Sequence, residues 1–272
     1  MNRTEKKIIT ILVIATVFSI LIGIFLFYIN DFYKATETAD TAMFGNEQVT
    51  VVEKGTYYLF DMAEDVSEQK TKESEIVSSD KQETEAKGTK EELNTQKKGI
   101  LFYPGGKVEE TAYAPLLLKL AEKGYEVYLV KMPMKLAIFG VNRAEEIMEE
   151  ASHITEWTMM GHSLGGAMAA SFSAEHEKQV DKLVLLAAYS TEDLSEKDID
   201  VYSFYGTEDK ILNMEKYEEY YDNLPKDVVE QVIDGGNHSG YAYYGEQDGD
   251  GTATISKEEQ QESVLDVLFG YE

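Results

Sequence analysis

One serine in this sequence lies between two glycines, in the heptapeptide MGHSLGG at residues 160–166. A hydroxyl becomes a useful nucleophile when a sharp turn lifts it clear of its surroundings and places it beside a base. Side chains two positions to either side would collide in such a turn, and Gly161 and Gly165 remove them. The pattern therefore predicts that Ser163 is a nucleophile carried on a strand-to-helix turn.

A nucleophilic serine needs a base, and the sequence has four histidines. His162 adjoins the serine and would point away from it. His153 and His176 fall near predicted helix ends, where a capping or solvated side chain is the simpler interpretation. His238 lies in a Gly-rich polar loop directly after the alternating residues 228–233, where a catalytic side chain is expected. We therefore predict that His238 is the base.

The base in turn needs an acid to orient it. A predicted strand at residues 200–205 ends in the loop GTEDKI at residues 206–211. Asp209 is the predicted acid, with Glu208 and Asp234 as alternatives. The resulting chain order of serine, aspartate and histidine is that of the α/β-hydrolases and differs from the orders in chymotrypsin-like and subtilisin-like proteases.

Acyl transfer at a serine also needs two backbone N–H groups to bind the oxyanion of the tetrahedral intermediate. The residue after the nucleophile, Leu164, is predicted to supply one of them. A predicted buried strand at residues 99–103 ends in Pro-Gly-Gly-Lys, a sequence that lets the backbone approach a ligand closely. Gly106 is the predicted second donor, with Lys107 as the alternative.

Four motifs occur in order between residues 103 and 238: YPGGKV at 103–108, KMP at 131–133, GHSLGGAMAA at 161–170 and GGNH at 235–238. Together they resemble the small bacterial α/β-hydrolases of the dienelactone-hydrolase-like "alpha/beta hydrolase fold-5" group. The resemblance covers residues 99–272 and implies Ser163 as nucleophile, Asp209 as acid and His238 as base. Dienelactone hydrolases proper use a cysteine nucleophile. This sequence has no cysteine, so that reaction is not implied.

Past residue 98 the sequence alternates predicted strands and helices, which indicates a mostly parallel sheet covered on both faces. A β-hairpin at residues 48–52 and 56–60 would add an antiparallel edge. A closing helix at residues 256–269 begins with a capping box formed by Ser256 and Glu259. We therefore predict an α/β-hydrolase fold at residues 99–272, with a doubly wound sheet and an N-terminal antiparallel hairpin.

The N-terminus carries 22 residues without a charge, 8–29, which is long enough to span a bilayer as a helix. Basic residues in the tail 1–7 place the N-terminus in the cytoplasm by the positive-inside rule. A cleaved signal peptide is the alternative, but its apolar region is usually shorter and no small-x-small cleavage site follows. We predict an uncleaved, single-pass transmembrane anchor and an extracytoplasmic stem and hairpin at residues 30–63, with the catalytic domain outside the cell membrane.

Residues 64–98 contain ten acidic and seven basic side chains and almost no large apolar ones. Such a segment cannot bury enough surface to offset its ordering entropy, so it is predicted to be a disordered loop, with a helical interaction segment as the alternative. The whole chain has a net charge of −26, which argues against nucleic acid and anionic membrane surfaces as partners.

The substrate pocket is predicted to include Met132, which follows a strand, and Tyr241, which follows the predicted base; core packing is the alternative for Met132. No cofactor is predicted. No metal site is predicted either, because the DGDG sequence at residues 248–251 lacks the ligand spacing and the terminal glutamate of an EF-hand. We expect a membrane-anchored serine hydrolase that cleaves a carboxylic ester or related acyl bond of a small molecule. The alternatives are an acyltransferase to a surface sugar or lipid and a non-catalytic binding module.

Overall fold

The computed structural model describes residues 3–63 and 97–270. The strands in these residues form a single eight-stranded sheet. Its order is β1-β2-β4-β3-β5-β6-β7-β8. The bounds are β1 Val49–Glu53, β2 Tyr57–Met62, β3 Lys98–Tyr103, β4 Glu126–Val130, β5 Glu156–His162, β6 Lys182–Leu186, β7 Asp200–Gly206 and β8 Val229–Ile233. β2 pairs antiparallel with β1 and β4, and the other neighbours are parallel. The predicted parallel sheet with an antiparallel N-terminal hairpin is confirmed.

The central strands are mostly apolar after their first residues, as expected where both faces of the sheet are covered. Every residue of β4 is buried, and so is every residue of β3 after its first. Ile100 and Phe102 of β3 contribute to one hydrophobic core, whereas Leu101 and Tyr103 contribute to a second. Successive side chains of a strand point to opposite faces, so one continuous apolar run supplies both cores.

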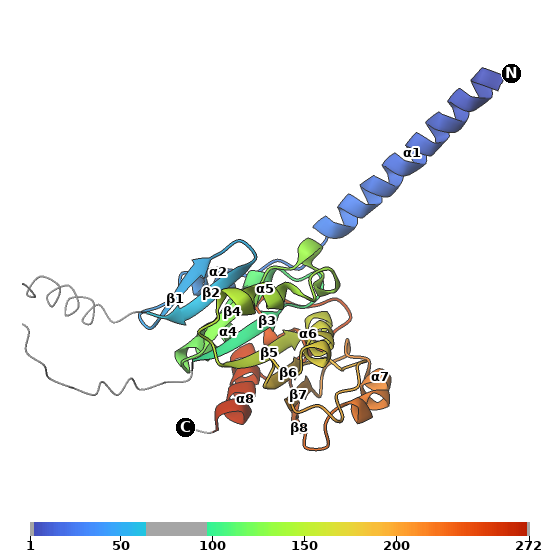
Figure 1. Cartoon of the computed structure of the whole chain (residues 1–272). Coiled ribbons are helices and arrows are strands. Elements are labelled where there is room, and N and C mark those ends of the chain that lie inside the picture. Colours follow the sequence, from blue (N-terminus) through green and yellow to red (C-terminus); the bar gives the residue numbers. More distant parts are fainter. Residues whose placement is uncertain (1–2, 64–96, 271–272) are drawn as a thin grey trace, which may run out of the picture.

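Helices cover both faces of the sheet (Figure 1). Their bounds are α1 Arg3–Asn30, α2 Glu37–Ala42, α4 Ala114–Glu122, α5 Arg143–Glu150, α6 Leu164–Glu175, α7 Met214–Glu219 and α8 Lys257–Phe269, and the short 3-10 helices are η1 Glu110–Tyr113, η2 Pro133–Lys135, η3 Ala137–Phe139, η4 Tyr221–Asn223 and η5 His238–Tyr241. Leu117 of α4 and Val264 of α8 join the first core, and Ile147 of α5 and Phe172 of α6 join the second. The capping box at Ser256 is present as predicted.

Helix α1 stands away from the rest of the molecule (Figure 1). The stretch Arg3–Tyr28 contains an apolar 18-residue window with a mean hydropathy of 2.9 and no buried residue, and by length and composition it could cross a membrane. The chain then returns to the domain. Tyr33 forms an isolated β-bridge with Val108, and the Thr36 N–H donates to the carbonyl of Tyr243 at 2.8 Å. The end of the apolar helix is thus tied to the loop that follows β3.

The predicted charged loop at residues 64–98 lies outside the described residues, apart from its last two. Lys97 precedes the sheet, and Lys98 is already the first residue of β3. The parallel sheet therefore begins one residue earlier than the predicted strand at residues 99–103.

The beginning of α6 lies against the end of β3, and this contact depends on glycine. A β-carbon on Gly165 would lie 2.1 Å from the carbonyl oxygen of Tyr103 and 2.4 Å from that of Pro104. On Gly161, a β-carbon would lie 2.6 Å from the backbone of Gly165. Because the obstructing atoms are backbone atoms, neither position has room for a side chain unless the strand and the helix move apart.

We predict that Gly165→Ala lowers the free energy of unfolding by about 2–3 kcal/mol, because the methyl group would overlap the backbone of β3. Gly55→Ala, in the β1–β2 turn, is the matched control: no atom lies within 4 Å of its β-carbon position. The control should change the stability by less than about 1 kcal/mol. Urea denaturation followed by circular dichroism measures both, and equal midpoints for the two variants would contradict the packing argument.

Candidate active site

Ser163 lies on the turn between β5 and α6, with backbone angles φ 53° and ψ −124°. A non-glycine residue in such a conformation costs about 1–3 kcal/mol and persists only when its surroundings enforce it. Two hydrogen bonds do so here: the Ser163 N–H donates to the carbonyl of Leu186 at 2.9 Å, and the Ser163 carbonyl accepts from Ala167 at 3.1 Å. The turn is therefore fixed to β6 on one side and to the first turn of α6 on the other.

His238 and Asp209 meet in a buried pair. The Nδ1 atom of His238 lies 2.8 Å from Oδ2 of Asp209, and both side chains are almost completely excluded from solvent. The other carboxylate oxygen, Oδ1, accepts the backbone N–H groups of Ile211 and Leu212, each at 2.8 Å. Three donors thus hold the carboxylate of Asp209 in one orientation, and it in turn sets the orientation of the imidazole.

Within residues 97–270, the two alternative acids, Glu208 and Asp234, are not bonded to His238 as Asp209 is. Asp234 is exposed, and its Oδ1 accepts a long hydrogen bond of 3.4 Å from the Thr207 hydroxyl. Glu208 is half-buried, and its backbone N–H donates to Gly236. No hydrogen bond joins either carboxylate to His238 in the described part of the chain. The geometry favours Asp209.

Ser163 and His238 line one cavity of about 350 Å³. Most of its other lining residues are apolar: Leu164, Ala167, Met168, Ala187, Ala188, Ile211 and Leu212, together with Tyr189, Thr191 and Asn213. A mostly apolar cavity with a hydroxyl and an imidazole at its wall suits a substrate that has an apolar group next to one polar reacting bond.

The predicted oxyanion donors are adjacent in space. A β-carbon on Gly106 would lie 3.0 Å from Cδ2 of Leu164. Leu164 is the first residue of α6, and neither its N–H nor that of Gly106 donates a hydrogen bond within the described residues. The alternative donor, Lys107, is already engaged, because its N–H donates to the carbonyl of Lys135 at 2.8 Å. The geometry favours Gly106 over Lys107.

A chain of buried hydrogen bonds that the sequence did not predict links three parts of the site. The N–H of Gly105 donates to the Tyr113 hydroxyl at 2.9 Å, and that hydroxyl lies 2.8 Å from Nδ1 of His162. On the other side of the ring, Nε2 of His162 lies 3.0 Å from the carbonyl of His238. Because that carbonyl can only accept, Nε2 carries the proton and Nδ1 accepts from Tyr113. Burial, followed by the nearby His238, lowers the pKa of His162 well below 6.5, so the ring is neutral.

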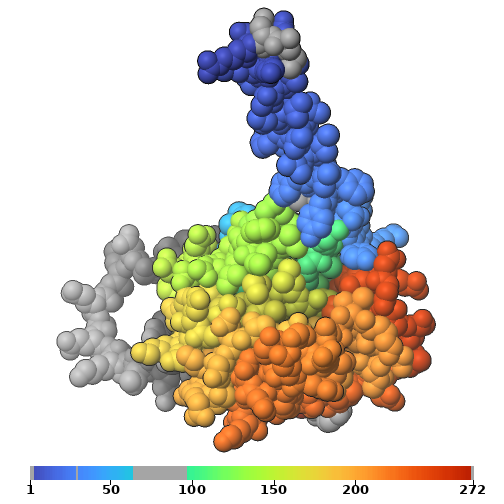
Figure 2. Space-filling model, turned by 90° about the vertical axis from the view of Figure 1, so that its right-hand side faces the viewer, coloured from blue at the N-terminus to red at the C-terminus, as the bar shows by residue number. Residues whose placement is uncertain are grey.

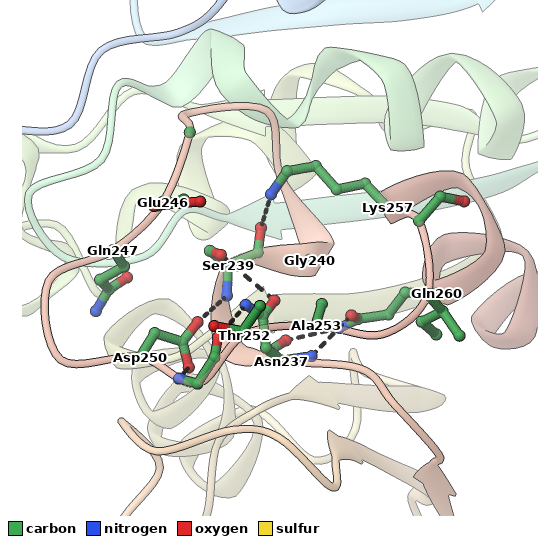
Figure 3. Close-up of a pocket in the computed structure, with 14 residues that line it drawn as sticks. Asn237, Ser239, Gly240, Glu246, Gln247, Asp250, Thr252, Ala253, Lys257 and Gln260 are labelled. Carbon is green, nitrogen blue, oxygen red and sulfur yellow. Dashed lines mark hydrogen bonds between the residues drawn. The ribbon is translucent and has the colours of Figure 1, made fainter.

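The loop that carries His238 is also held from its other side (Figure 3). Asp250 accepts the backbone N–H groups of His238 and Ser239 at 3.3 and 3.0 Å. The ammonium group of Lys257 donates to the carbonyl of Ser239 at 2.7 Å, and burial lowers its pKa. The side chain of Gln260 bonds both the N–H and the carbonyl of Asn237. These side chains fix the backbone of the loop.

The structure does not bring the two predicted pocket residues to the cavity. Tyr241 is completely buried, with its ring centroid 5.5 Å from that of His162, and Met132 belongs to the second hydrophobic core. Neither is among the described residues that line the cavity. Tyr241 turns inward because η5 folds the loop after His238 back onto the core. Among the described residues, no group of three or more histidine, aspartate or glutamate side chains could hold a metal ion.

Residues 99–262 match the model of a family described as the alpha/beta hydrolase family. No curated protein matches the chain by sequence. Among solved structures, a predicted CIB-like hydrolase from Thermoplasma acidophilum is similar at 13% identity with a TM-score of 0.55, covering 81% of this chain and 98% of its own. The carboxylesterase CesB from Bacillus subtilis is similar at 10% identity with a TM-score of 0.53, covering 87% and 96%. At these identities the likeness concerns the fold alone.

We predict that His162 makes the protein less stable in acid. Its pKa lies below 6.5 in the folded state, so the unfolded chain binds a proton that the folded chain does not. The free energy of unfolding should therefore fall as the pH drops below about 6.5, by up to about 1.4 kcal/mol per pH unit from this group. Urea titrations between pH 5 and 7.5 measure this slope. His162→Gln should reduce it, and an identical slope in the variant would refute the assignment.

Proposed function

The chain belongs to the alpha/beta hydrolase family, and we propose that it is a serine hydrolase that cleaves a carboxylic ester or a related acyl bond. One observation carries the proposal. Ser163 and His238 line the same cavity, while Nδ1 of His238 is bonded to the buried carboxylate of Asp209. A hydroxyl, an imidazole and an orienting carboxylate in this relation are the parts that acyl transfer through a serine requires.

The first half of the reaction acylates the enzyme. The Ser163 hydroxyl oxygen attacks the carbonyl carbon of the ester, and Nε2 of His238 takes the hydroxyl proton. The carboxylate of Asp209 stabilises the imidazolium that forms. The N–H groups of Gly106 and Leu164 bind the oxyanion. When the intermediate collapses, the bond to the alcohol oxygen breaks, and His238 gives its proton to the departing alcohol.

The second half releases the acid. A water molecule enters the place that the alcohol has left, and His238 takes one of its protons as the water attacks the acyl-enzyme carbonyl. The bond to Ser163 then breaks, and the serine oxygen recovers the proton from His238. The products are one alcohol and one carboxylic acid for each water consumed, and the enzyme returns to its starting state.

The cavity supports an ester with an apolar acyl or alcohol group as the substrate. Its wall is formed largely by short and medium apolar side chains of α6 and of the loops after β6 and β7. The similar fold of a carboxylesterase agrees with this substrate class. A small-molecule ester with a hydrophobic part would gain about 0.8 kcal/mol for each methylene group buried there.

We further propose that α1 anchors the enzyme in the cell membrane as a single span, with its N-terminus in the cytoplasm. The span Arg3–Tyr28 is long and apolar enough, and no residue of its most apolar window is buried within the protein. Arg3, Lys6 and Lys7 precede the apolar stretch, which favours a cytoplasmic N-terminus. The hydrolase domain would then work on the extracytoplasmic side.

We predict that Ser163→Ala lowers kcat for 4-nitrophenyl butyrate by about 10⁴-fold or more, because the nucleophile is gone. Asp209→Asn should lower it by about 10³- to 10⁴-fold, since the amide would favour the wrong tautomer of His238. Asp234→Asn removes a carboxylate from an exposed neighbouring loop and should stay within about twofold of the wild type. Steady-state kinetics on the three folded variants measures the losses. Hydrolysis of the ester by Ser163→Ala at the wild-type rate would contradict the proposed mechanism.

A further inference from the structure

The end of the apolar helix is fixed directly beside the proposed oxyanion loop. Tyr28 is the last residue of the span, and its ring lies 4.7 Å from the ammonium group of Lys107. The same ammonium group pairs with Asp31 at 2.8 Å. Lys107 follows Gly106, the proposed oxyanion donor, in the chain. The residue next to the proposed donor therefore contacts the last turn of the membrane-spanning stretch.

The loop after β4 is held in the same place. Lys135 at the end of η2 has its ammonium group 4.5 Å from the ring of Phe32, and its carbonyl accepts the N–H of Lys107. Met134 and Lys135 both have positive φ angles, 53° and 55°, which costs non-glycine residues about 1–3 kcal/mol each. A backbone strained in this way persists only where contacts with its surroundings hold it in place. Here the contacts come from the helix end and the oxyanion loop.

The segment at residues 133–139, which spans η2 and η3, presents apolar side chains to the outside. Met134, Ile138 and Phe139 are 37%, 56% and 56% exposed. The neighbouring Leu136 instead points inward, since its Cδ2 would lie 3.6 Å from a β-carbon on Gly106. In Figure 2 the lower end of α1 meets the domain next to the light-green surface that contains this segment. An exposed apolar surface therefore adjoins both the membrane-spanning helix and the active site.

We propose that residues 133–139 rest in the surface of the membrane that α1 spans, and that the substrate is an acyl ester drawn from that bilayer. The proposal rests on the assignment of Ser163 as a hydrolase nucleophile and of α1 as the anchor. Helix α6 carries three residues of the catalytic cavity, Leu164, Ala167 and Met168, and η3 packs against the same helix. In this proposal an ester from the outer leaflet enters beside residues 133–139 and reaches the cavity of Ser163 along α6, the helix that borders both.

The charges near the helix end indicate which kind of bilayer suits this contact. Lys107 and Lys135 are paired with Asp31 and Glu110, at 2.8 and 2.9 Å. The chain as a whole carries a charge of −26. Attraction to anionic headgroups therefore does not hold the domain to the surface, and the contact depends on apolar burial. A zwitterionic bilayer should suffice.

Fluorescence quenching tests the contact. The full chain is reconstituted in phosphatidylcholine vesicles whose acyl chains are brominated, after flotation shows that it is bound to them. The native Trp157 is buried and supplies a baseline. Phe139→Trp should add emission that the bromine quenches, whereas Val232→Trp, on β8 at the far edge of the sheet and 38% exposed, should add emission that it does not. Equal quenching of the two added tryptophans would overturn the proposal.

Kinetics in the same vesicles tests the substrate class. The double variant Ile138→Asp/Phe139→Asp should lower the turnover of a long-chain 4-methylumbelliferyl ester dissolved in the bilayer by about tenfold, since two apolar side chains leave the lipid. Turnover of the water-soluble acetate ester should not change, which also shows that the variant is folded. Val232→Asp should affect neither ester.

The outcomes separate the two proposals. Unchanged turnover of the long-chain ester in the double variant would overturn the membrane-derived substrate. If the wild type hydrolyses neither ester, the assignment of Ser163 as an esterase nucleophile fails, and the quenching result still decides whether residues 133–139 lie in the bilayer.

Discussion

The site depends on one backbone conformation, that of Ser163. Its φ of 53° and ψ of −124° are unfavourable for a serine, and the cost of about 1–3 kcal/mol must be met by the surrounding packing. The packing of helix α6 on the end of β3 offsets this cost. That packing is possible only because Gly161 and Gly165 have no side chains. The same close approach brings Leu164 beside Gly106. A single packing contact thus presents the hydroxyl and assembles the proposed oxyanion site.

A second constraint holds the loops of the proposed site in fixed positions relative to one another. The hydrogen bonds from Gly105 through Tyr113 and His162 to the carbonyl of His238 join the loop after β3, the turn after β5 and the loop after β8. These three loops come from distant parts of the sequence, and each carries one proposed element of catalysis. Because the connection is buried and its imidazole is neutral, it holds the loops together without placing a second charge beside the pair formed by His238 and Asp209.

Much of this architecture could be predicted from local sequence. Runs of apolar residues predicted the parallel strands, and the alternating segments at residues 48–52 and 56–60 predicted the hairpin. The pair of Ser256 and Glu259 predicted the start of α8. Ser163, Asp209 and His238 could be chosen because each follows a predicted strand and their chain order is informative. The structure brings Asp209 and His238 into contact and places Ser163 and His238 in one cavity. Their catalytic role remains our proposal.

The supporting side chains could not be predicted in this way. His162 contacts Tyr113, 49 residues earlier, and the carbonyl of His238, 76 residues later, so no local pattern marks its role. Asp250 lies in a sequence typical of a surface turn, yet its carboxylate binds the backbone of the His238 loop. Tyr241 was predicted to line the pocket from its position alone, and η5 turns it into the core instead. Such contacts follow from how loops fold over one another, which residue spacing does not specify.

The most direct measurement is covalent capture of the nucleophile. The folded full-length chain is treated with a fluorophosphonate, and its peptides are analysed by mass spectrometry, with the urea-unfolded chain as the control. We expect one phosphonyl group per folded chain, on Ser163, and none on the unfolded chain, because only the assembled site activates the hydroxyl. A folded, ester-hydrolysing enzyme that carries no adduct on Ser163 would contradict the account.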